Sequence, residues 1–252
     1  MTFDVTATAY ADFMGRYSEP LAVQFADWVG VRAGHDALDV GCGPGALTAQ
    51  LVDRLGPAAV TAVDPSESFV AATRARFPEV DVRSGAAENL PFPDDGFDLA
   101  LAQLVVHFMS DPVAGLAEMG RVTRPGGLVA ACVWDHAGEG GPLATFWRAV
   151  RDLDPGAHDE SGLAGAREGH LGELCLRAGL TDVESSTLTV RVRFESFDAW
   201  WEPFTLGVGP AGSYVGALDE GRRDALRSRC AQLQPRAPFE VGATAWCVQA
   251  RP

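Results

Sequence analysis

Short apolar runs in this chain alternate with segments of helical character. Runs at 37–40 and 58–63 each lead into such a segment, at 46–55 and 66–77. Strand alternating with helix is the pattern of a parallel sheet with helices on both faces. We therefore expect an α/β protein with a doubly wound sheet.

The alternation continues to residue 134. Further strands are predicted at residues 80–84, 97–102 and 128–134. Asp111 and Pro112 are typical of a helix start, and that helix is expected to reach about residue 123. The segments 91–96 and 125–127 are rich in proline and glycine, which end regular elements.

Beyond residue 134 the alternation weakens. Helices are predicted at 143–153, 169–178 and 218–233, and strands at 183–194 and 239–248. The irregular segments, about 1–35, 135–170 and 197–237, are interpreted as cap segments around one sheet. The chain 1–252 is thus expected to be a single domain with its core at 36–134.

Composition narrows the possible functions. The 252 residues are 47% hydrophobic, enough for one large core, and 20 basic against 34 acidic residues give a net charge of −14. That charge disfavours nucleic acid and anionic membranes as partners. Every basic residue is arginine, so lysine Schiff bases and the Walker A lysine are excluded.

Cysteine usage and the N-terminal sequence give a location. The five cysteines are widely spaced without a C-x-x-C pair, so neither a disulfide framework nor a metal site is expected. No basic leader and no apolar stretch of about 20 residues occurs. We expect a cytoplasmic protein that does not associate with membranes.

A glycine loop carries the first chemical signal. Gly41, Gly43 and Gly45 follow a strand and open a helix, where a side chain would obstruct a ligand approaching the backbone. Asp64 ends the next strand, where a doubly wound sheet places the carboxylate that accepts ribose hydroxyls. Together they predict a nucleoside-containing cofactor.

The spacing of the loop separates two cofactors. Dinucleotide sites have G-x-G-x-x-G, whereas here the third glycine comes one residue early, after Pro44. Asp39 also places a carboxylate where a pyrophosphate would be repelled and an amino group welcomed. The balance favours S-adenosylmethionine, with an NAD-dependent oxidoreductase as the alternative.

Five motifs occur in the order seen in class I S-adenosylmethionine-dependent methyltransferases: DVGCGPG (39–45), VDPS (63–66), ENLPF (88–92), FD (97–98) and RVTRPGG (121–127). The chain resembles most the small-molecule branch that includes the ubiquinone and menaquinone biosynthesis methyltransferases. The resemblance implies a Rossmann-like sheet of seven strands whose last strand is antiparallel. It also implies S-adenosyl-L-methionine as cofactor and S-adenosyl-L-homocysteine as product.

The resemblance further implies cofactor contacts from Arg16, Tyr17, Asp39, Gly41, Gly43, Gly45, Asp64, Pro65, Ala86, Ala87, Glu88 and Gln103. Asp39 would hold the amino group, Asp64 the ribose and the backbone N–H of Ala87 the adenine. Gln103 would lie beside the methionine part.

The N-terminal helix and the adenine side of this site leave choices open. Arg16 and Tyr17 would meet the cofactor carboxylate or simply pack in an N-terminal helix. The family often has an acidic residue where this chain has Ala86, so adenine recognition would be weaker or made by backbone alone. Glu88 would substitute in part or remain a solvated charge.

Methyl transfer needs positioning more than a catalytic triad, and we find no triad. His107 and His136 follow the fourth and fifth predicted strands, where open α/β sheets bind ligands. Each would act as a base or orient the acceptor. Alternatively, His107 only lines the pocket and His136 only turns the chain.

Aromatic residues gather in the cap segments: Phe146, Trp147, Phe197, Trp200, Trp201, Phe204 and Tyr214. They would form either an apolar lid or the cap's own core. We predict methylation at O, N or C of a small acceptor, with an apolar or aromatic one expected if these residues form a lid. The other candidates are the oxidoreductase and a protein that binds the cofactor without catalysis.

Overall fold

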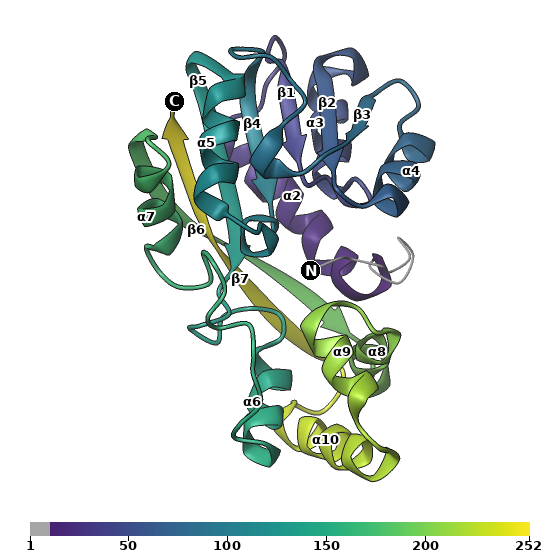
Figure 1. Ribbon diagram of the computed structural model, residues 1–252. Coiled ribbons are helices and arrows are strands. Elements are labelled where there is room, and N and C mark those ends of the chain that lie inside the picture. Colours follow the sequence, from purple (N-terminus) through teal and green to yellow (C-terminus); the bar gives the residue numbers. More distant parts are fainter. Residues whose placement is uncertain (1–10) are drawn as a thin grey trace.

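The computed structural model describes residues 11–252, with a seven-stranded sheet at the centre (Figure 1). The strands are β1 (Ala37–Val40), β2 (Val60–Asp64), β3 (Asp81–Ser84), β4 (Phe97–Gln103), β5 (Thr123–Trp134), β6 (Thr181–Phe194) and β7 (Phe239–Arg251). Their order is β3-β2-β1-β4-β5-β7-β6. The first five are parallel and β7 is antiparallel to both neighbours, which confirms the predicted fold class.

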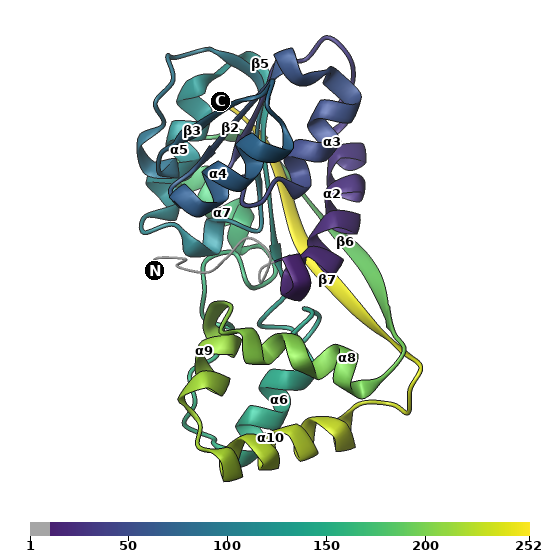
Figure 2. The ribbon, with the colours of Figure 1, turned by 90° about the vertical axis from the view of Figure 1, so that its right-hand side faces the viewer.

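Helices cover both faces of the sheet. They are α2 (Arg16–Val29), α3 (Ala46–Leu55), α4 (Glu67–Arg76), α5 (Pro112–Val122), α6 (Ala144–Leu153), α7 (His170–Arg177), α8 (Phe197–Trp201), α9 (Gly209–Ala217) and α10 (Glu220–Leu233). Single turns lie at Ala11–Gly15, Pro57–Ala59, Ala87–Asn89, Val106–Phe108 and Glu202–Leu206. Buried side chains of α2 and α3 join one apolar cluster, and those of α5 and α7 join the other across the sheet (Figure 2). None of these helices, within 11–252, is long and apolar enough to cross a membrane.

The structure tests two local predictions, the start of helix α5 and the segment 125–127. The N-cap at Asp111 is confirmed, because its Oδ1 accepts hydrogen bonds from the N–H groups of Val113 and Ala114. The turn expected at 125–127 is instead an irregular segment inside β5. Phe97 pairs with residue 123 of β5 and Leu99 with residue 128, so the intervening residues interrupt the pairing.

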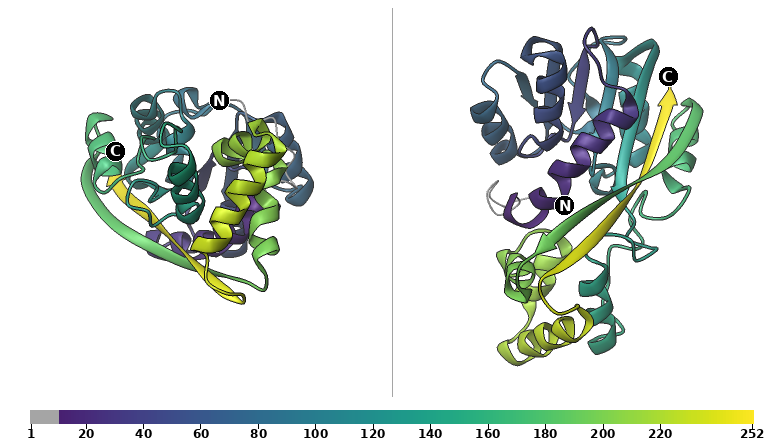
Figure 3. Two further views of the ribbon diagram at one scale, coloured as in Figure 1. Left: turned by 90° about the horizontal axis from the view of Figure 1, so that it is seen from below. Right: turned by 180° about the vertical axis from the view of Figure 1, so that it is seen from behind.

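The four helices α6, α8, α9 and α10 lie together beyond the carboxyl ends of the parallel strands (Figure 1). We call this group, with its connections, the cap. Strands β6 and β7 run into it (Figure 3), since β5 stops where Trp134 pairs with Ala245 but β6 and β7 stay paired as far as Phe194 and Phe239. The first ten residues of the segment 1–35, which was interpreted as part of a cap, lie outside the described residues.

The aromatic residues of the cap pack mostly on one another. The rings of Phe146 and Phe204 stack with centroids 4.5 Å apart, and Trp200 lies 4.9 Å from Phe204. Phe146, Trp147, Trp200 and Phe204 are all at most 4% exposed. Of the two interpretations of these aromatics, the structure favours a core that holds the cap together.

Candidate functional site

The loop between β1 and α3 has three glycines in left-handed backbone conformations, with φ of +72° at Gly41, +53° at Gly43 and +88° at Gly45. A Cβ added to Gly41 would lie 2.4 Å from Val105, and one added to Gly45 would lie 2.8 Å from Phe77. The same position on Gly43 has no neighbour within 4 Å among the described residues. Gly41 and Gly45 therefore have no room for a side chain because neighbouring residues pack against them, whereas the backbone at Gly43 is uncrowded.

A cavity of about 270 Å³ lies beside this loop, at the carboxyl ends of β1, β2 and β4. We call it the first cavity. Nine of the predicted cofactor contacts line it: Asp39, Gly41, Gly43, Asp64, Pro65, Ala86, Ala87, Glu88 and Gln103. Four separate stretches of the chain are thus brought to one place, because parallel strands end at the same edge of a sheet.

Three predicted contacts, Arg16, Tyr17 and Gly45, do not line the first cavity. The guanidinium of Arg16 donates a hydrogen bond of 3.1 Å to the carbonyl of Ala199 and lies 5.1 Å from the ring centroid of Phe194. Tyr17 is 4% exposed, with its ring centroid 6.3 Å from that of Phe194. Burial raises the pKa of Tyr17. Both side chains join α2 to β6 and the cap, so of the two alternatives left open for them the structure favours packing over a cofactor contact.

Asp64 ties the end of β2 to the glycine loop. Its Oδ2 accepts the N–H of Gly43 and its Oδ1 accepts the N–H of Ser66, each at 2.8 Å. The side chain is 6% exposed, and this burial raises the pKa of the carboxyl group. Each carboxylate oxygen still has a second lone pair, so Asp64 can accept further hydrogen bonds from a ligand.

Asp39 forms the floor of the first cavity. It is 1% exposed, and its Oδ2 accepts a hydrogen bond of 2.6 Å from the hydroxyl of Thr48. Burial raises the pKa of Asp39 to about 7, and the nearby charge of Asp64 contributes in the same direction. Two carboxyl groups in one wall disfavour anionic ligand groups and favour a cationic one.

Two polar atoms of this wall have no partner among residues 11–252. The amide nitrogen of Gln103 donates to the carbonyl of Ser18 at 2.9 Å, which joins β4 to α2. The Oε1 of Gln103 and the hydroxyl of Ser18 are buried without hydrogen bonds. Both residues line the first cavity, so a ligand with an amino and a carboxylate group would satisfy an acceptor and a donor there.

Residues 86–88 form the wall opposite the glycine loop. The Oε1 of Glu88 accepts the N–H groups of Ser110 and Asp111, at 2.6 and 3.2 Å. Glu88 is therefore not a free solvated charge; it also lines the first cavity, and its contact with a cofactor stays a prediction. It fixes the segment that precedes α5.

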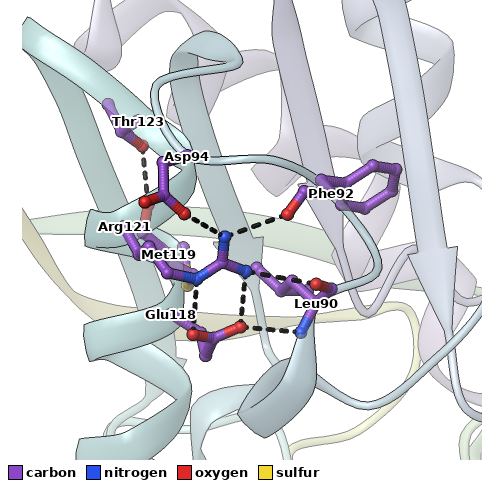
Figure 4. A network of polar contacts seen from close by, with 7 residues as sticks. All are labelled: Leu90, Phe92, Asp94, Glu118, Met119, Arg121 and Thr123. Carbon is purple, nitrogen blue, oxygen red and sulfur yellow. Dashed lines mark hydrogen bonds and ion pairs between the residues drawn. The ribbon is translucent and has the colours of Figure 1, made fainter.

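Arg121 lies at the centre of a polar network with the loop that follows this wall (Figure 4). Its guanidinium donates to the carbonyls of Leu90 and Phe92 and to the carboxylates of Asp94 and Glu118, at distances of 2.7 to 3.2 Å. Glu118 in turn accepts the N–H of Leu90 at 2.9 Å. The motifs at 88–92 and 121–127 thus meet in space, and one arginine holds the loop that follows the cavity wall.

A second cavity, of about 40 Å³, lies between the sheet and the cap. Leu104 and Phe108 line both cavities, so the two share a wall. Leu104 has a φ of +61°, an uncommon backbone conformation for a residue other than glycine. Such strain is most often found at functional sites.

The second cavity brings His107 and His136 together, with their ring centroids 5.8 Å apart. Burial lowers the pKa of His136 to about 4. Burial and the neighbouring His136 lower the pKa of His107 well below its usual range. Both imidazoles are therefore uncharged at neutral pH, and each has one buried nitrogen without a hydrogen-bond partner in the described chain.

Glu160 is the residue that sequence reasoning missed. It lines the second cavity, is 5% exposed, and accepts a hydrogen bond of 2.7 Å from the indole N–H of Trp147. Burial raises its pKa to about 7. No motif surrounds it, and in a Gly- and Asp-rich stretch it is indistinguishable from a loop charge.

Comparison with known proteins identifies methyltransferases among the similar sequences. Residues 38–131 match the family described as "Methyltransferase domain". Nocamycin O-methyltransferase of Saccharothrix syringae is 35% identical over 51% of this chain and 48% of its own length. Demethylmenaquinone methyltransferase of Beutenbergia cavernae is 41% identical over 42% of this chain and 43% of its own length. The chain spans about half or less of the length of the curated relatives it matches.

Solved structures share the fold over nearly the whole chain. The YcgJ protein of Bacillus subtilis superposes with a TM-score of 0.59 and 20% identity, covering 94% of this chain and 99% of that one. Phosphoethanolamine N-methyltransferase 2 of Haemonchus contortus, in complex with S-adenosyl-L-methionine, gives a TM-score of 0.60 and 16% identity. It covers 98% of this chain and 57% of that one.

Proposed function

The chain belongs, through residues 38–131, to the class I S-adenosylmethionine-dependent methyltransferases, and from this premise we propose that it methylates a small molecule. The first cavity is the proposed cofactor site and the second cavity the proposed acceptor site. The observation that carries the proposal is the shared wall of Leu104 and Phe108, which puts the two sites in contact.

The residues of the first cavity fit S-adenosylmethionine. The cofactor ends in an amino acid, and the wall offers the partnerless hydroxyl of Ser18 and the partnerless Oε1 of Gln103. Its sulfonium and ammonium are positive, which suits Asp39 and Asp64. The open side of Gly43 leaves room for a ligand against the loop backbone.

When bound, the cofactor supplies a methyl group on a positively charged sulfur that is already activated for displacement. In our proposal Asp64 accepts the ribose hydroxyls, and Asp39 and Gln103 hold the amino group. The backbone of Ala87 meets the adenine. The chain's main contribution to rate is then to orient donor and acceptor and to exclude water.

The proposal of a small-molecule acceptor is supported by the relatives and by the second cavity. The named relatives act on different molecules, as their names state: nocamycin, demethylmenaquinone and phosphoethanolamine. What they share is a small-molecule acceptor, and the small volume of the second cavity agrees with that. A pyrophosphate-containing cofactor fits worse, since Asp39 and Asp64 would repel its charges.

Calorimetric titration of the purified chain with S-adenosylhomocysteine, with NADH as the control, tests the cofactor. We expect saturable binding of the first alone. Binding of NADH alone would refute the proposal in favour of hydride transfer. Transfer of a labelled methyl group to a metabolite extract then separates an enzyme from a protein that only binds the cofactor.

The variant Asp64→Ala tests the proposed ribose contact. It removes the ribose acceptor and two backbone hydrogen bonds, one to Gly43 of the glycine loop and one to Ser66, so S-adenosylhomocysteine affinity should fall about 100-fold, or about 2.7 kcal/mol. Wild-type affinity in a folded Asp64→Ala protein would contradict the proposed ribose contact.

A further inference from the structure

The second cavity combines apolar walls with three ionisable side chains. Phe13, Leu104, Phe108 and Trp134 give it aromatic and aliphatic surface, while His107, His136 and Glu160 supply the polar atoms. Building such groups into an apolar cavity costs stability unless they meet a partner. A ligand with a polar group on an apolar frame would be that partner.

We propose that Glu160 accepts the proton of a hydroxyl group on an uncharged, apolar acceptor such as a phenol. The inference rests on the proposed function, because it assumes that the second cavity holds the acceptor. It adds to that function a class of acceptor and a residue for which no role was predicted.

The hydrogen bonds of Glu160 leave one oxygen free for this task. Its Oε2 accepts the indole N–H of Trp147, whose ring is buried and lies with its centroid 5.1 Å from that of Phe146. Within residues 11–252 the other oxygen, Oε1, accepts no hydrogen bond. Trp147 thus fixes the carboxyl group while leaving Oε1 for a ligand.

The charges around the cavity select against other acceptors. Among residues 11–252 no arginine lines it, and both imidazoles are held neutral, so an acceptor carboxylate or phosphate would find no cation there. The carboxyl group of Glu160 exchanges its proton near neutral pH, as a proton acceptor must. His107 and His136 can each add a hydrogen bond to the same acceptor through their partnerless nitrogens.

The step balances without a further reagent. The acceptor O–H bond breaks, its proton passes to Oε1 of Glu160, and the oxygen lone pair forms the new O–CH₃ bond. The C–S bond breaks with its electron pair left on sulfur, so the positive charge of the sulfonium is neutralised. The proton then leaves Glu160 for water.

The test measures binding, so that it does not depend on turnover. Phenol and its methyl ether, anisole, are titrated into protein saturated with S-adenosylhomocysteine. Phenol is chosen because it is the smallest aromatic hydroxyl and the cavity is small. We expect wild-type protein to prefer phenol by about tenfold, since anisole leaves Oε1 without a donor.

Glu160→Gln is the informative variant. The amide oxygen is required by Trp147, so the amide nitrogen takes the place of Oε1 and can only donate. Phenol and anisole both offer an oxygen acceptor, and the preference should fall to within twofold. Glu195→Gln is the matched control, because Glu195 is an exposed partner of Arg193 and does not line the cavity; it should keep the wild-type preference.

The outcomes separate the inference from the function beneath it. Absence of S-adenosylhomocysteine binding to wild-type protein refutes the proposed function. Normal S-adenosylhomocysteine binding with an equal phenol preference in wild type and Glu160→Gln, or with no preference in either, overturns the role of Glu160. Stronger binding of benzylamine than of phenol, lost in Glu160→Gln, would assign the carboxylate to a cationic acceptor and overturn the hydroxyl class.

Discussion

The two cavities are built in different ways. The first is lined largely by short runs of neighbouring residues: a glycine loop, strand ends and residues 86–88, placed by the order of a parallel sheet. The second is assembled from side chains of segments far apart in sequence, among them Phe13, His107, Glu160 and Pro210. A site lined by runs of neighbouring residues leaves motifs in the sequence, whereas a site assembled from single residues far apart does not.

If the two cavities are independent, a substitution that destabilises the cap should leave the affinity for the cofactor unchanged. Phe204 is 2% exposed and packs against Phe146 and Phe13. Phe204→Ala should lower the free energy of unfolding by about 3–5 kcal/mol, because it leaves a hole in the cap core. Urea unfolding measures that loss.

Calorimetry on the same variant supplies the comparison. S-adenosylhomocysteine affinity should stay within about twofold of wild type, because Phe204 does not line the first cavity. A tenfold fall would mean that the cap shapes the cofactor site and that the two halves are coupled.

Within the glycine loop, two substitutions separate packing from ligand space. Gly41→Ala places a methyl group 2.4 Å from Val105 in a left-handed conformation, so we expect a loss of about 2–4 kcal/mol in the free energy of unfolding. Gly43→Ala meets no protein atom and should cost about 1 kcal/mol, from its backbone alone. Urea unfolding of the two variants measures both values.

The order of the two effects should reverse for binding. Gly43→Ala adds a methyl group to a residue that lines the first cavity. The affinity for S-adenosylhomocysteine should therefore fall about tenfold, although the effect on the fold is small. Equal destabilisation by the two variants would show that crowding against Val105 does not set the conformation of the loop.

This contrast also explains what the sequence could predict. Strand β1 and helix α3 were predicted to the residue, and the seven strands with an antiparallel last strand followed from the family resemblance. The roles of Arg16 and Tyr17 stayed open because a helix can present the same residues to a ligand or to a neighbouring strand, and only tertiary packing decides. Glu160 could not be identified from the sequence because its burial depends on Trp147, a residue 13 positions away in another element.

The last prediction concerns the charge of Asp39, which sets the cofactor cavity apart from the neutral imidazoles of the acceptor cavity. With a pKa of about 7, Asp39 is charged above that pH and protonated below it, and Asp64 and Cys42 are its titratable neighbours. The ammonium group of S-adenosylhomocysteine prefers the charged form of Asp39, so its affinity should fall about tenfold from pH 8 to pH 6.

Asp39→Asn isolates this effect, because an asparagine oxygen can still accept the hydrogen bond of Thr48 but carries no charge. Its affinity should be low and nearly constant over the same pH range. Folding raises the pKa of Asp39, so the folded wild type holds a proton that the unfolded chain releases between about pH 4 and 7, and its stability falls as the pH rises through that window. Asp39→Asn lacks this penalty and should unfold at higher urea than wild type at pH 8. Lower stability there would mean that the negative charge itself, and not only the side-chain shape, holds the glycine loop in place.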